Sequence, residues 1–481
     1  MGQSHGRTEP DTEKKVEDGA ACELAYGTCG MRGWRENMED AHLVDLEFTP
    51  ELSLLGVFDG HGGGAVAKYV ALNLGAMVTQ EVAAAKTAKN ASSVVGAALG
   101  EAMRCSFLAM DVQLKTKEAV AELAAFENAE EAAAEAEAEA EAKAAEEAAA
   151  AEDAGADGGA EEEGEGHPLN DLDDDQEVKV RFGADGALEI GVVEGAASGE
   201  GAAEGGEAAE DEDDGEEQGD PPITMSLSAL KRLLAGQGSF RQLMGGGAEG
   251  DAEEGAEGDE GEPLNPAVHC GCTSVVACVD RKRRELVVAN AGDSRCVLSR
   301  GGVAVDLSED HTPTLARELA RITKAGGTVT EEGRIDGNLN LSRAIGDFSM
   351  KQNDALSAVE QKVSAEPEIR VEALTGAEDF VILACDGIWE RLSSQEVVDF
   401  VSARLAGASA GASAGAAGKR ARATPKALSV ICGELCDECL ASDRDEHDGY
   451  GCDNMTVLIV DLRGMLAAEG GAEMPAKRAK A

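Results

Sequence analysis

Acidic residues stand at the ends of apolar segments at several places in this chain. Asp59 directly follows the run LSLLGVF, and Asp386 directly follows FVILAC. Six acidic residues share this kind of placement: Glu39, Asp40, Asp59, Asp293, Asp386 and Asp453. If these segment ends meet in space, the carboxylates repel one another unless cations or protons intervene. Oxygen ligands suit Mg²⁺, Mn²⁺ or Ca²⁺ rather than zinc or copper.

A turn is the alternative interpretation of any single Asp-Gly at a strand end, because aspartate hydrogen-bonds the backbone there. Several such ends in one chain favour a metal site, and one of them lies in Asp-Gly-His-Gly-Gly, which begins at Asp59. Glycines in this run let a tetrahedral anion approach the backbone. His61 beside a metal-activated water is a candidate general acid. Arg35 is a candidate phosphate clamp, although a plain surface arginine is the alternative.

Composition separates an ordinary domain from a strongly acidic part. The 481 residues include 94 Asp+Glu and 42 Lys+Arg, a formal charge of −52, and only 3% aromatics. One compact domain with all that charge would repel itself, so we expect a disordered acidic region. We find no apolar run of transmembrane length and no signal peptide. Gly2 suggests N-myristoylation, but Gly6 stands where the motif has Ser or Thr, so this modification is left open. Without zinc-ligand spacing, the twelve cysteines are interpreted as reduced thiols.

The order of patterned and acidic segments predicts one domain that is split by an insertion. We expect five parts: a flexible tail at 1–24, a first half-domain at 25–117, an acidic low-complexity insertion at 118–265, a second half-domain at 266–465, and a basic tail at 466–481. Strands are predicted at 51–58, 272–279, 285–289, 295–299, 380–385 and 456–462. Helices are predicted at 64–82, 92–114, 315–325, 394–405 and 426–440. Strands joined by short turns favour an antiparallel α+β architecture.

The insertion contains two less acidic islands. Its first block, 118–152, is almost all Ala and Glu without an apolar stripe, which predicts a solvated or fluctuating helix. Residues 177–193 are interpreted as a small hairpin. Residues 223–244 have leucines at roughly helical spacing and are a candidate docking helix. Residues 406–424 are expected to form a loop.

Several motifs, taken in order, resemble the metal-dependent protein phosphatases, the protein phosphatase type 2C family. They are GWRENMEDAH at 33–42, GVFDGHGG at 56–63, ANAGDSRC at 289–296, DHTP at 310–313, LSRAIGD at 341–347, ACDGIW at 384–389 and GCDNMT at 451–456. The matching regions cover about 27–117 and 267–462, and the layout is most similar to a family isoform with a long acidic insertion.

The resemblance implies a β-sandwich of two antiparallel sheets flanked by helices, with metals at one end. It implies that Asp59 bridges two Mg²⁺ or Mn²⁺ ions, that the Gly60 carbonyl binds the first, and that Asp386 and Asp453 hold the second. Five further residues receive roles by the same resemblance: Glu39 and Asp40 act through metal-bound waters, Asp293 with Asp386 holds a third, weaker metal, Arg35 binds phosphate and His61 is the acid.

The implied reaction is hydrolysis of phosphoserine and phosphothreonine by a hydroxide that bridges the metals. Two departures from the family pattern are Cys270-Gly271-Cys272-Thr273-Ser274 at a strand start, and Glu390 where many members have Asp. The rival hypothesis is a non-catalytic acidic binder, but such a protein should have lost a ligand aspartate.

The negative charge of the insertion predicts that the partners are phosphorylated proteins, in particular basic ones. Nucleic acid and anionic membranes are not expected, because both are negatively charged. The insertion either docks substrates or only keeps the protein soluble. We expect a monomer, and the basic clusters Lys419-Arg420-Ala421-Arg422 and Lys477-Arg478-Ala479-Lys480 favour the nucleus together with the cytoplasm.

Overall fold

The computed structural model describes residues 9–89, 96–153, 177–182, 188–192, 223–226, 264–410, 423–444 and 449–467. The chain divides into two compact units. The first comprises Met1–Glu147 with Gly261–Ala481, and the second comprises Ala148–Glu260. None of the described helices combines the length and apolar character needed to cross a bilayer.

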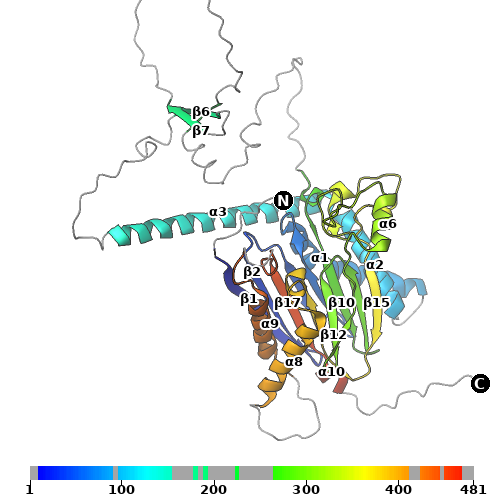
Figure 1. Ribbon diagram of the computed structural model, residues 1–481. Helices are drawn as coiled ribbons and strands as arrows, with labels where there is room; N and C mark the ends of the chain where they lie inside the picture. The colour runs from blue at the N-terminus through cyan, green and yellow to red at the C-terminus, as the bar shows by residue number, and fades with distance from the viewer. Residues whose placement is uncertain are drawn as a thin grey trace, which may run out of the picture. The chain divides into compact units, whose positions relative to one another are not determined.

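Two antiparallel sheets form the centre of the first unit (Figure 1). The six-stranded sheet has the order β1 (Asp11–Ala21), β2 (Leu24–Gly33), β17 (Met455–Asp461), β16 (Glu378–Ala384), β12 (Arg295–Arg300) and β13 (Val303–Asp306). The five-stranded sheet has the order β15 (Glu368–Ala373), β11 (Glu285–Ala291), β10 (Ser274–Asp280), β4 (Leu52–Phe58) and β3 (Ala41–Asp45). This is the predicted α+β sandwich of two antiparallel sheets.

The sandwich follows from the two-residue period of its strands. In β4, Leu55 and Val57 point into the core shared by the two sheets, where they join Leu383 and Leu458 of the other sheet. Leu54 lies on the opposite face of β4 and belongs to a separate core under the helices. Both faces of these central strands are buried, which explains why their sequences are apolar runs rather than alternating patterns.

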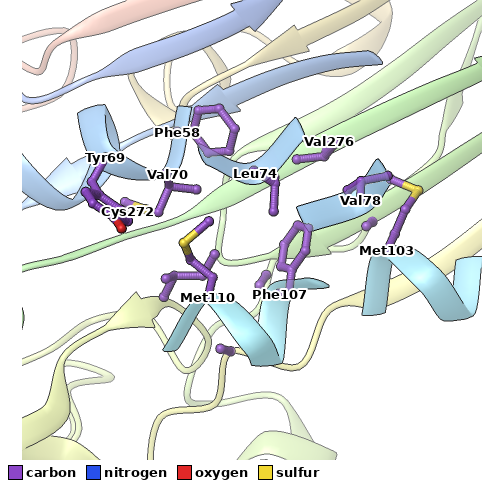
Figure 2. Close-up of a cluster of buried hydrophobic side chains, with 14 of the residues drawn as sticks. Phe58, Tyr69, Val70, Leu74, Val78, Met103, Phe107, Met110, Cys272 and Val276 are labelled. Atoms are coloured by element: carbon purple, nitrogen blue, oxygen red, sulfur yellow. The ribbon is translucent and has the colours of Figure 1, made fainter. Parts of the chain in front are cut away.

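Helices cover the outer face of each sheet (Figure 1). Helices α1 (Ala65–Lys89) and α2 (Gly96–Gln113) pack on the five-stranded sheet, whereas α8 (Ser394–Ala410) and α9 (Pro425–Cys439) pack on the six-stranded sheet. Figure 2 shows the first of these cores, in which Leu74 of α1 and Phe107 of α2 lie near Val276 of β10. These side chains are fully buried. Burying each one contributes about 1.5–3 kcal/mol, so the helix–sheet contacts hold the strand ends in place.

Smaller elements complete the first unit. A short sheet is formed by β5 (Gly60–His61), β9 (Gly271–Cys272) and β14 (Ile345–Gly346). The remaining helices are α6 (Ala316–Lys324), α7 (Asp386–Trp389) and α10 (Arg463–Ala467). Three short 3₁₀ helices are also present: η1 (Pro266–Val268), η2 (Phe348–Met350) and η3 (Ala358–Glu360).

The prediction of a flexible tail at 1–24 is wrong for Asp11–Ala21, which is strand β1 and pairs with β2. The two strands are joined by Cys22 and Glu23, with φ of 52° and 63°. Two positive φ values at the centre of a two-residue loop match the twist of a hairpin. Asn-Gly usually marks such a turn, so this sequence lacks the usual signal.

The first block of the insertion is helix α3 (Lys117–Asp153). The expectation that this helix is solvated is wrong for its first turns, which are partly buried. Ala119 and Leu123 are buried in the core with α1 and α2, and Phe126 packs against it. The expected boundary at 118 therefore cuts through the hydrophobic core. A stripe formed by 119, 123 and 126 spans only two turns, and the Ala/Glu composition of the longer block conceals it.

Three strands are described in the second unit. The predicted hairpin at 177–193 is confirmed as β6 (Glu177–Phe182) paired with β7 (Leu188–Val192). The predicted docking helix at 223–244 is wrong at its start, because Ile223–Ser226 is strand β8 and pairs with β6. The rest of that segment lies outside the described residues. Likewise, α8 continues to Ala410 inside the expected loop at 406–424, of which 411–422 lie outside the described residues.

Candidate metal centre and active site

One end of the sandwich carries a cleft of about 450 Å³ where the predicted site residues converge. The cleft is lined by eight of the nine residues: Arg35, Glu39, Asp59, Gly60, His61, Asp293, Asp386 and Asp453. The ninth, Asp40, lies behind the cleft, with a carboxylate oxygen within 4.8 Å of one from Asp59. The structure thus brings all nine residues to one place, although they come from both halves of the sequence.

Three carboxylates meet at the bottom of the cleft. Asp59, Asp293 and Asp386 each place an oxygen within 4.8 Å of the others. Asp59 follows β4, Asp386 begins α7 with one residue between it and the end of β16, and Asp293 lies in the turn between β11 and β12. Because neighbouring antiparallel strands end at the same edge of the sandwich, residues far apart in sequence meet there.

The electrostatics of this cluster are unfavourable for bare carboxylates. The pKa of Asp59 is raised well above its usual value by burial, then by repulsion from Asp386 and Asp40. Burial raises the pKa of Asp40 to about 7, and burial together with Asp453 raises the pKa of Asp386 to about 6. Burial and then Asp386 also raise the pKa of Asp293 well above its usual value. A bound cation would relieve this repulsion.

Buried oxygens without a hydrogen-bond partner support a cation-binding role. Within the described part of the chain, both carboxylate oxygens of Asp40 and Oδ1 of Asp293 lack a partner. An unsatisfied buried carboxylate is costly unless another charge compensates it. The donor set consists of carboxylate oxygens with an adjacent glycine carbonyl, so it fits Mg²⁺ or Mn²⁺. Cys385 Sγ also approaches Asp40 and Asp59, and burial raises the pKa of its thiol well above the usual value.

The backbone around Asp59 needs glycine at two positions. A Cβ on Gly60 would lie 2.3 Å from the carbonyl oxygen of Glu39, and one on Gly62 would lie 2.7 Å from that of His269. Gly62 also has a φ of +72°. These contacts hold the loop that follows β4 tightly against its neighbours. Asp59 is further fixed because the Thr273 amide donates to its carbonyl oxygen at 2.8 Å.

Arg35 stands at the mouth of the cleft, with its side chain half exposed. Its Nη2 donates to Asp453 Oδ2 at 2.6 Å, so the guanidinium is oriented by one of the predicted metal ligands. Asp453 is not among the three carboxylates that meet at the bottom of the cleft, although it lines the same cleft. An oriented, partly exposed guanidinium in this place is suited to a phosphate group.

His61 is held by a partner that the sequence motifs did not reveal as functional. Its Nε2 lies 2.7 Å from Oδ2 of Asp347, which is almost fully buried. Burial lowers the pKa of His61, but Asp347 outweighs burial and the net pKa is raised. Asp347 is the final residue of the motif LSRAIGD, and this position is the only local signal of its role in the sequence.

Sequence reasoning missed two further residues that line the cleft. Asn454 accepts the Glu39 amide on Oδ1 at 2.9 Å, and its Nδ2 donates to the carbonyl oxygens of Arg32 and Asn37. It therefore ties the Arg35–Asp40 loop to β17. Arg334 is an exposed guanidinium on the rim of the cleft. Asn454 stands beside Asp453 in a motif, whereas nothing in the local sequence of Arg334 marks it.

Comparisons with known proteins identify the family of this chain. The model of the protein phosphatase 2C family matches residues 24–129 and 243–448. The chain is 32% identical over 454 residues to Probable protein phosphatase 2C 11 of Oryza sativa subsp. japonica, covering 94% of this chain and 89% of the relative. It is 34% identical over 545 aligned positions to Protein phosphatase 1G of Homo sapiens, covering 96% and 93%. The rat protein of that name is 33% identical, covering 94% and 91%.

The chain therefore belongs to the protein phosphatase 2C family. Its relatives include proteins named Protein phosphatase 1G, the gamma isoform of the family, which confirms the predicted resemblance.

Proposed function

We propose that this protein is a Mg²⁺- or Mn²⁺-dependent phosphatase that hydrolyses phosphoserine and phosphothreonine in proteins. Family membership supports a protein phosphatase that acts on phosphorylated proteins. The observation that carries the metal dependence is the convergence of Asp59, Asp293 and Asp386 in the cleft that also contains Arg35 and His61.

The residues that would hold the ions are those whose oxygens face the cleft. Asp59, the Gly60 carbonyl, Asp386 and Asp453 would hold two ions, and Asp293 with Asp386 a third, weaker one. Glu39 and Asp40 would act through water. The pKa of Glu390 is raised to about 7, first by desolvation and then by Asp386 and Asp453, which places this residue in the same electrostatic field. When bound, such ions activate water and neutralise phosphate charge.

The chain's own groups act on the substrate at two points. Arg35 binds the phosphate oxygens, and its bond to Asp453 keeps the guanidinium at the cleft mouth. His61, kept protonated by Asp347, gives its proton to the serine or threonine oxygen as that oxygen leaves phosphorus. Asp347 is a positioning residue in this scheme, since it touches His61 and not the substrate.

A phosphopeptide assay tests the proposed activity. Phosphate release should require Mn²⁺ or Mg²⁺, stop on addition of EDTA and return when the ion is restored. Full activity in chelator would overturn the metal dependence. Release of no phosphate from any phosphoserine or phosphothreonine peptide with Mn²⁺ would instead favour the non-catalytic acidic binder.

We further propose that the acidic insertion captures basic phosphoproteins for the same site. The net charge of −52 supports this, because a strongly negative arm attracts basic partners over a range that salt screens. The same charge disfavours nucleic acid and anionic membranes as partners. A tethered docking arm raises the local substrate concentration without altering the chemistry.

The docking proposal is tested by replacing residues 148–260 with a flexible Gly/Ser linker. At low salt, the KM for a phosphorylated histone-like protein should rise, while the KM for a small neutral phosphopeptide should stay unchanged. Equal responses of the two substrates would show that the insertion only keeps the protein soluble.

We also propose that the protein is a monomer of the nucleus and cytoplasm. The basic clusters at 419–422 and 477–480, which support the nuclear location, lie outside the described residues, as does Gly2. Fluorescence imaging of a tagged chain with both clusters neutralised tests the location, since continued nuclear accumulation would remove this support. Sedimentation at micromolar concentration tests the monomer.

A further inference from the structure

Helix α3, which opens the acidic insertion, begins inside the catalytic unit. Ala119 and Leu123 are buried there, and the part of α3 up to Glu147 belongs to the first unit. Two glutamates further along the helix, Glu130 and Glu137, contact segments that carry site residues. Both contacts are made within the described residues of one compact unit.

Glu137 forms a bidentate ion pair with Arg32 near the end of β2. Arg32 Nη1 donates to Glu137 Oε2 at 2.8 Å, and Nη2 donates to Oε1 at 2.7 Å. On its other edge, Arg32 Nε donates to Asp11 Oδ2 at 2.9 Å. A guanidinium held by two parallel hydrogen bonds is fixed in orientation as well as in charge. Its side chain is only 17% exposed, so the contact is not a freely solvated surface pair.

Arg32 stands at the base of the loop that supplies Arg35, Glu39 and Asp40. Its Nη1 also donates to the carbonyl oxygen of Glu36 at 3.2 Å, which lies within that loop. Its own carbonyl oxygen accepts from Asn454 Nδ2 at 2.9 Å, and the same amide group binds the Glu39 backbone. A shift of Arg32 is therefore transmitted to the loop through two sets of hydrogen bonds.

Glu130 contacts the second site loop, which runs from Asp59 to the start of α1. The Gly64 amide donates to Glu130 Oε2 at 3.4 Å, and Lys68 Nζ pairs with Oε1. The neighbouring amide of Gly63 donates to Glu39 Oε2 at 3.2 Å. Glu130 and Glu39 thus occupy adjacent amides at the beginning of α1, where carboxylates are favoured by the helix dipole.

We propose that Glu130 and Glu137 are positioning residues for the metal site, so that the acidic insertion contributes to catalysis as well as to substrate capture. Glu137 acts through Arg32 on the loop of Glu39 and Asp40, and Glu130 acts through Gly64 on the loop of Asp59 and His61. This inference rests on the proposed phosphatase activity. Partners that hold metal ligands in place typically matter about 10- to 100-fold in metal affinity or activity.

The alternative is that the two contacts only fasten α3 to the unit. Surface ion pairs often contribute little to stability, and a purely structural role would change neither the metal response nor the turnover. A test must therefore measure the metal site directly and compare carboxylates of the same helix.

Three single variants provide this comparison: Glu130→Gln, Glu137→Gln and, as the matched control, Glu122→Gln. Glu122 is exposed on α3, and the described part of the chain shows no partner for it. With a small neutral phosphopeptide, Glu137→Gln and Glu130→Gln should each lower kcat and raise the Mn²⁺ concentration for half-maximal activity, by about tenfold. The KM should change little, and Glu122→Gln should behave as wild type.

Metal binding is read without activity as the increase in Tm when a fixed concentration of Mn²⁺ is added. Because stabilisation of the folded state by a ligand at fixed concentration grows with the logarithm of its affinity, this increase should be smaller in Glu130→Gln and Glu137→Gln than in Glu122→Gln. Arg32→Gln should lower kcat as Glu137→Gln does, and the double variant should be no worse than Arg32→Gln alone, because both act through one contact. If Glu137→Gln is unfolded at the assay temperature, Glu137→Asp takes its place, because it keeps the negative charge on a shorter side chain. Glu137→Asp should show an intermediate loss of kcat and of the Mn²⁺-induced rise in Tm.

Glutamine variants that match Glu122→Gln in kcat and in the Mn²⁺-induced rise of Tm would overturn the proposal, even if their Tm without metal is lower. If wild-type protein releases no phosphate with Mn²⁺, the proposed activity fails, and the comparison of Tm increases still decides whether the two glutamates support the metal site.

Discussion

His61 Nε2 and Asp347 Oδ2 lie 2.7 Å apart, although 286 positions separate the two residues in the chain. Asp347 has a left-handed backbone with a φ of 50°, and a non-glycine residue in this conformation requires support from its surroundings. Its amide donates to the carbonyl oxygen of Cys270 at 3.0 Å. A Cβ on Gly271 would lie 2.2 Å from Asp347 Oδ2 and 2.6 Å from His61 Nε2, so the glycine makes room for the pair.

Asp347→Asn should lower kcat for a phosphopeptide about tenfold or more, because His61 loses the charge that keeps it protonated. Asparagine tolerates the left-handed backbone, so the fold should persist. Since Asp347 raises the pKa of His61, its removal lowers that pKa, and the alkaline limit of kcat should move to lower pH. The pH profile of kcat for both proteins measures the shift.

Leaving-group dependence provides the control for Asp347→Asn and for His61→Gln. A nitrophenolate leaves with little protonation, so nitrophenyl phosphate should show a smaller loss than a phosphoserine peptide in both variants. Equal losses for the two substrates, with an unmoved pH limit, would mean that the pair is structural.

Asp59→Asn should reduce kcat by more than about 100-fold, since Asp59 is a proposed direct ligand and direct ligands matter more than the groups that support them. It should also raise the Tm measured in EDTA, because one of several mutually repelling carboxylates is removed. Asp399→Asn, on the exposed surface of α8, is the control and should change neither quantity. A Tm that falls in EDTA would contradict the repulsion among Asp59 and its neighbouring carboxylates.

The stability of the metal-free protein should decrease as the pH rises from about 4 to about 7. The pKa of Asp386 is about 6 and that of Asp40 about 7 in the folded chain, both above the usual value. The folded state therefore binds more protons than the unfolded state in this interval, and its stability falls as they leave. Urea unfolding in EDTA measures this trend, and saturating Mn²⁺ should remove it. A metal-free protein whose stability rises between these pH values would refute the prediction.

A buried ion-pair network away from the proposed metal site should give the opposite pH dependence. Glu318 is 1% exposed and lies 2.6 Å from Arg343 Nη2, with Arg321 on its other oxygen. Burial raises the pKa of Glu318, but Arg343 and Arg321 outweigh it and lower the pKa to about 2. Its stabilising contribution is complete above the unfolded pKa near 4.5 and disappears as the pH falls toward 2.

Glu318→Gln should therefore destabilise the protein by about 3 kcal/mol at pH 7, since two arginines lose their buried partner. Urea unfolding at several pH values measures both this loss and its disappearance in acid. Glu331→Gln, at an exposed residue for which the described part of the chain shows no partner, is the control and should leave the unfolding curve unchanged. A difference between Glu318→Gln and wild type that persists at pH 2 would argue against the ionic origin.

The insertion can be removed only from beyond the anchored part of α3. The helix from Lys117 to Glu147 spans about 45 Å, whereas Asn265 Nδ2 donates to the Leu114 carbonyl oxygen at 2.9 Å. A linker of about 25 residues is therefore needed to replace 148–260. That variant should keep the wild-type Tm and the kcat for a small phosphopeptide.

Replacing 118–260 by the same linker should cost at least about 2 kcal/mol, because Leu123 and Ala119 leave the core. Thermal unfolding of the two variants makes the comparison. Equal Tm values would show that α3 adds nothing to the unit. We therefore expect that the anchored start of α3 cannot be removed together with the rest of the insertion without a loss of stability.

The sequence by itself determined the central strands and the aspartates at their ends. An apolar run such as 380–385 has few alternatives to a buried strand, and Asp386 then stands where that strand leaves the core. Patterns of this kind act over a few residues, so local sequence is enough to place them. The turn at Gly62, with a φ of +72°, is local in the same way, whereas Gly60 is required by the close approach of the Glu39 carbonyl oxygen.

Only the tertiary structure decided which of these segments support one another. Strand β1 pairs with β2 through a two-residue turn in which Cys22 and Glu23 both have positive φ values. No turn motif in the sequence predicts this turn. The contacts of His61 with Asp347 and of Arg32 with Glu137 join residues 286 and 105 positions apart. The free energy of such contacts depends on burial and orientation, which arise only when the sandwich and α3 pack together, so the residues involved look like ordinary charged residues in the sequence.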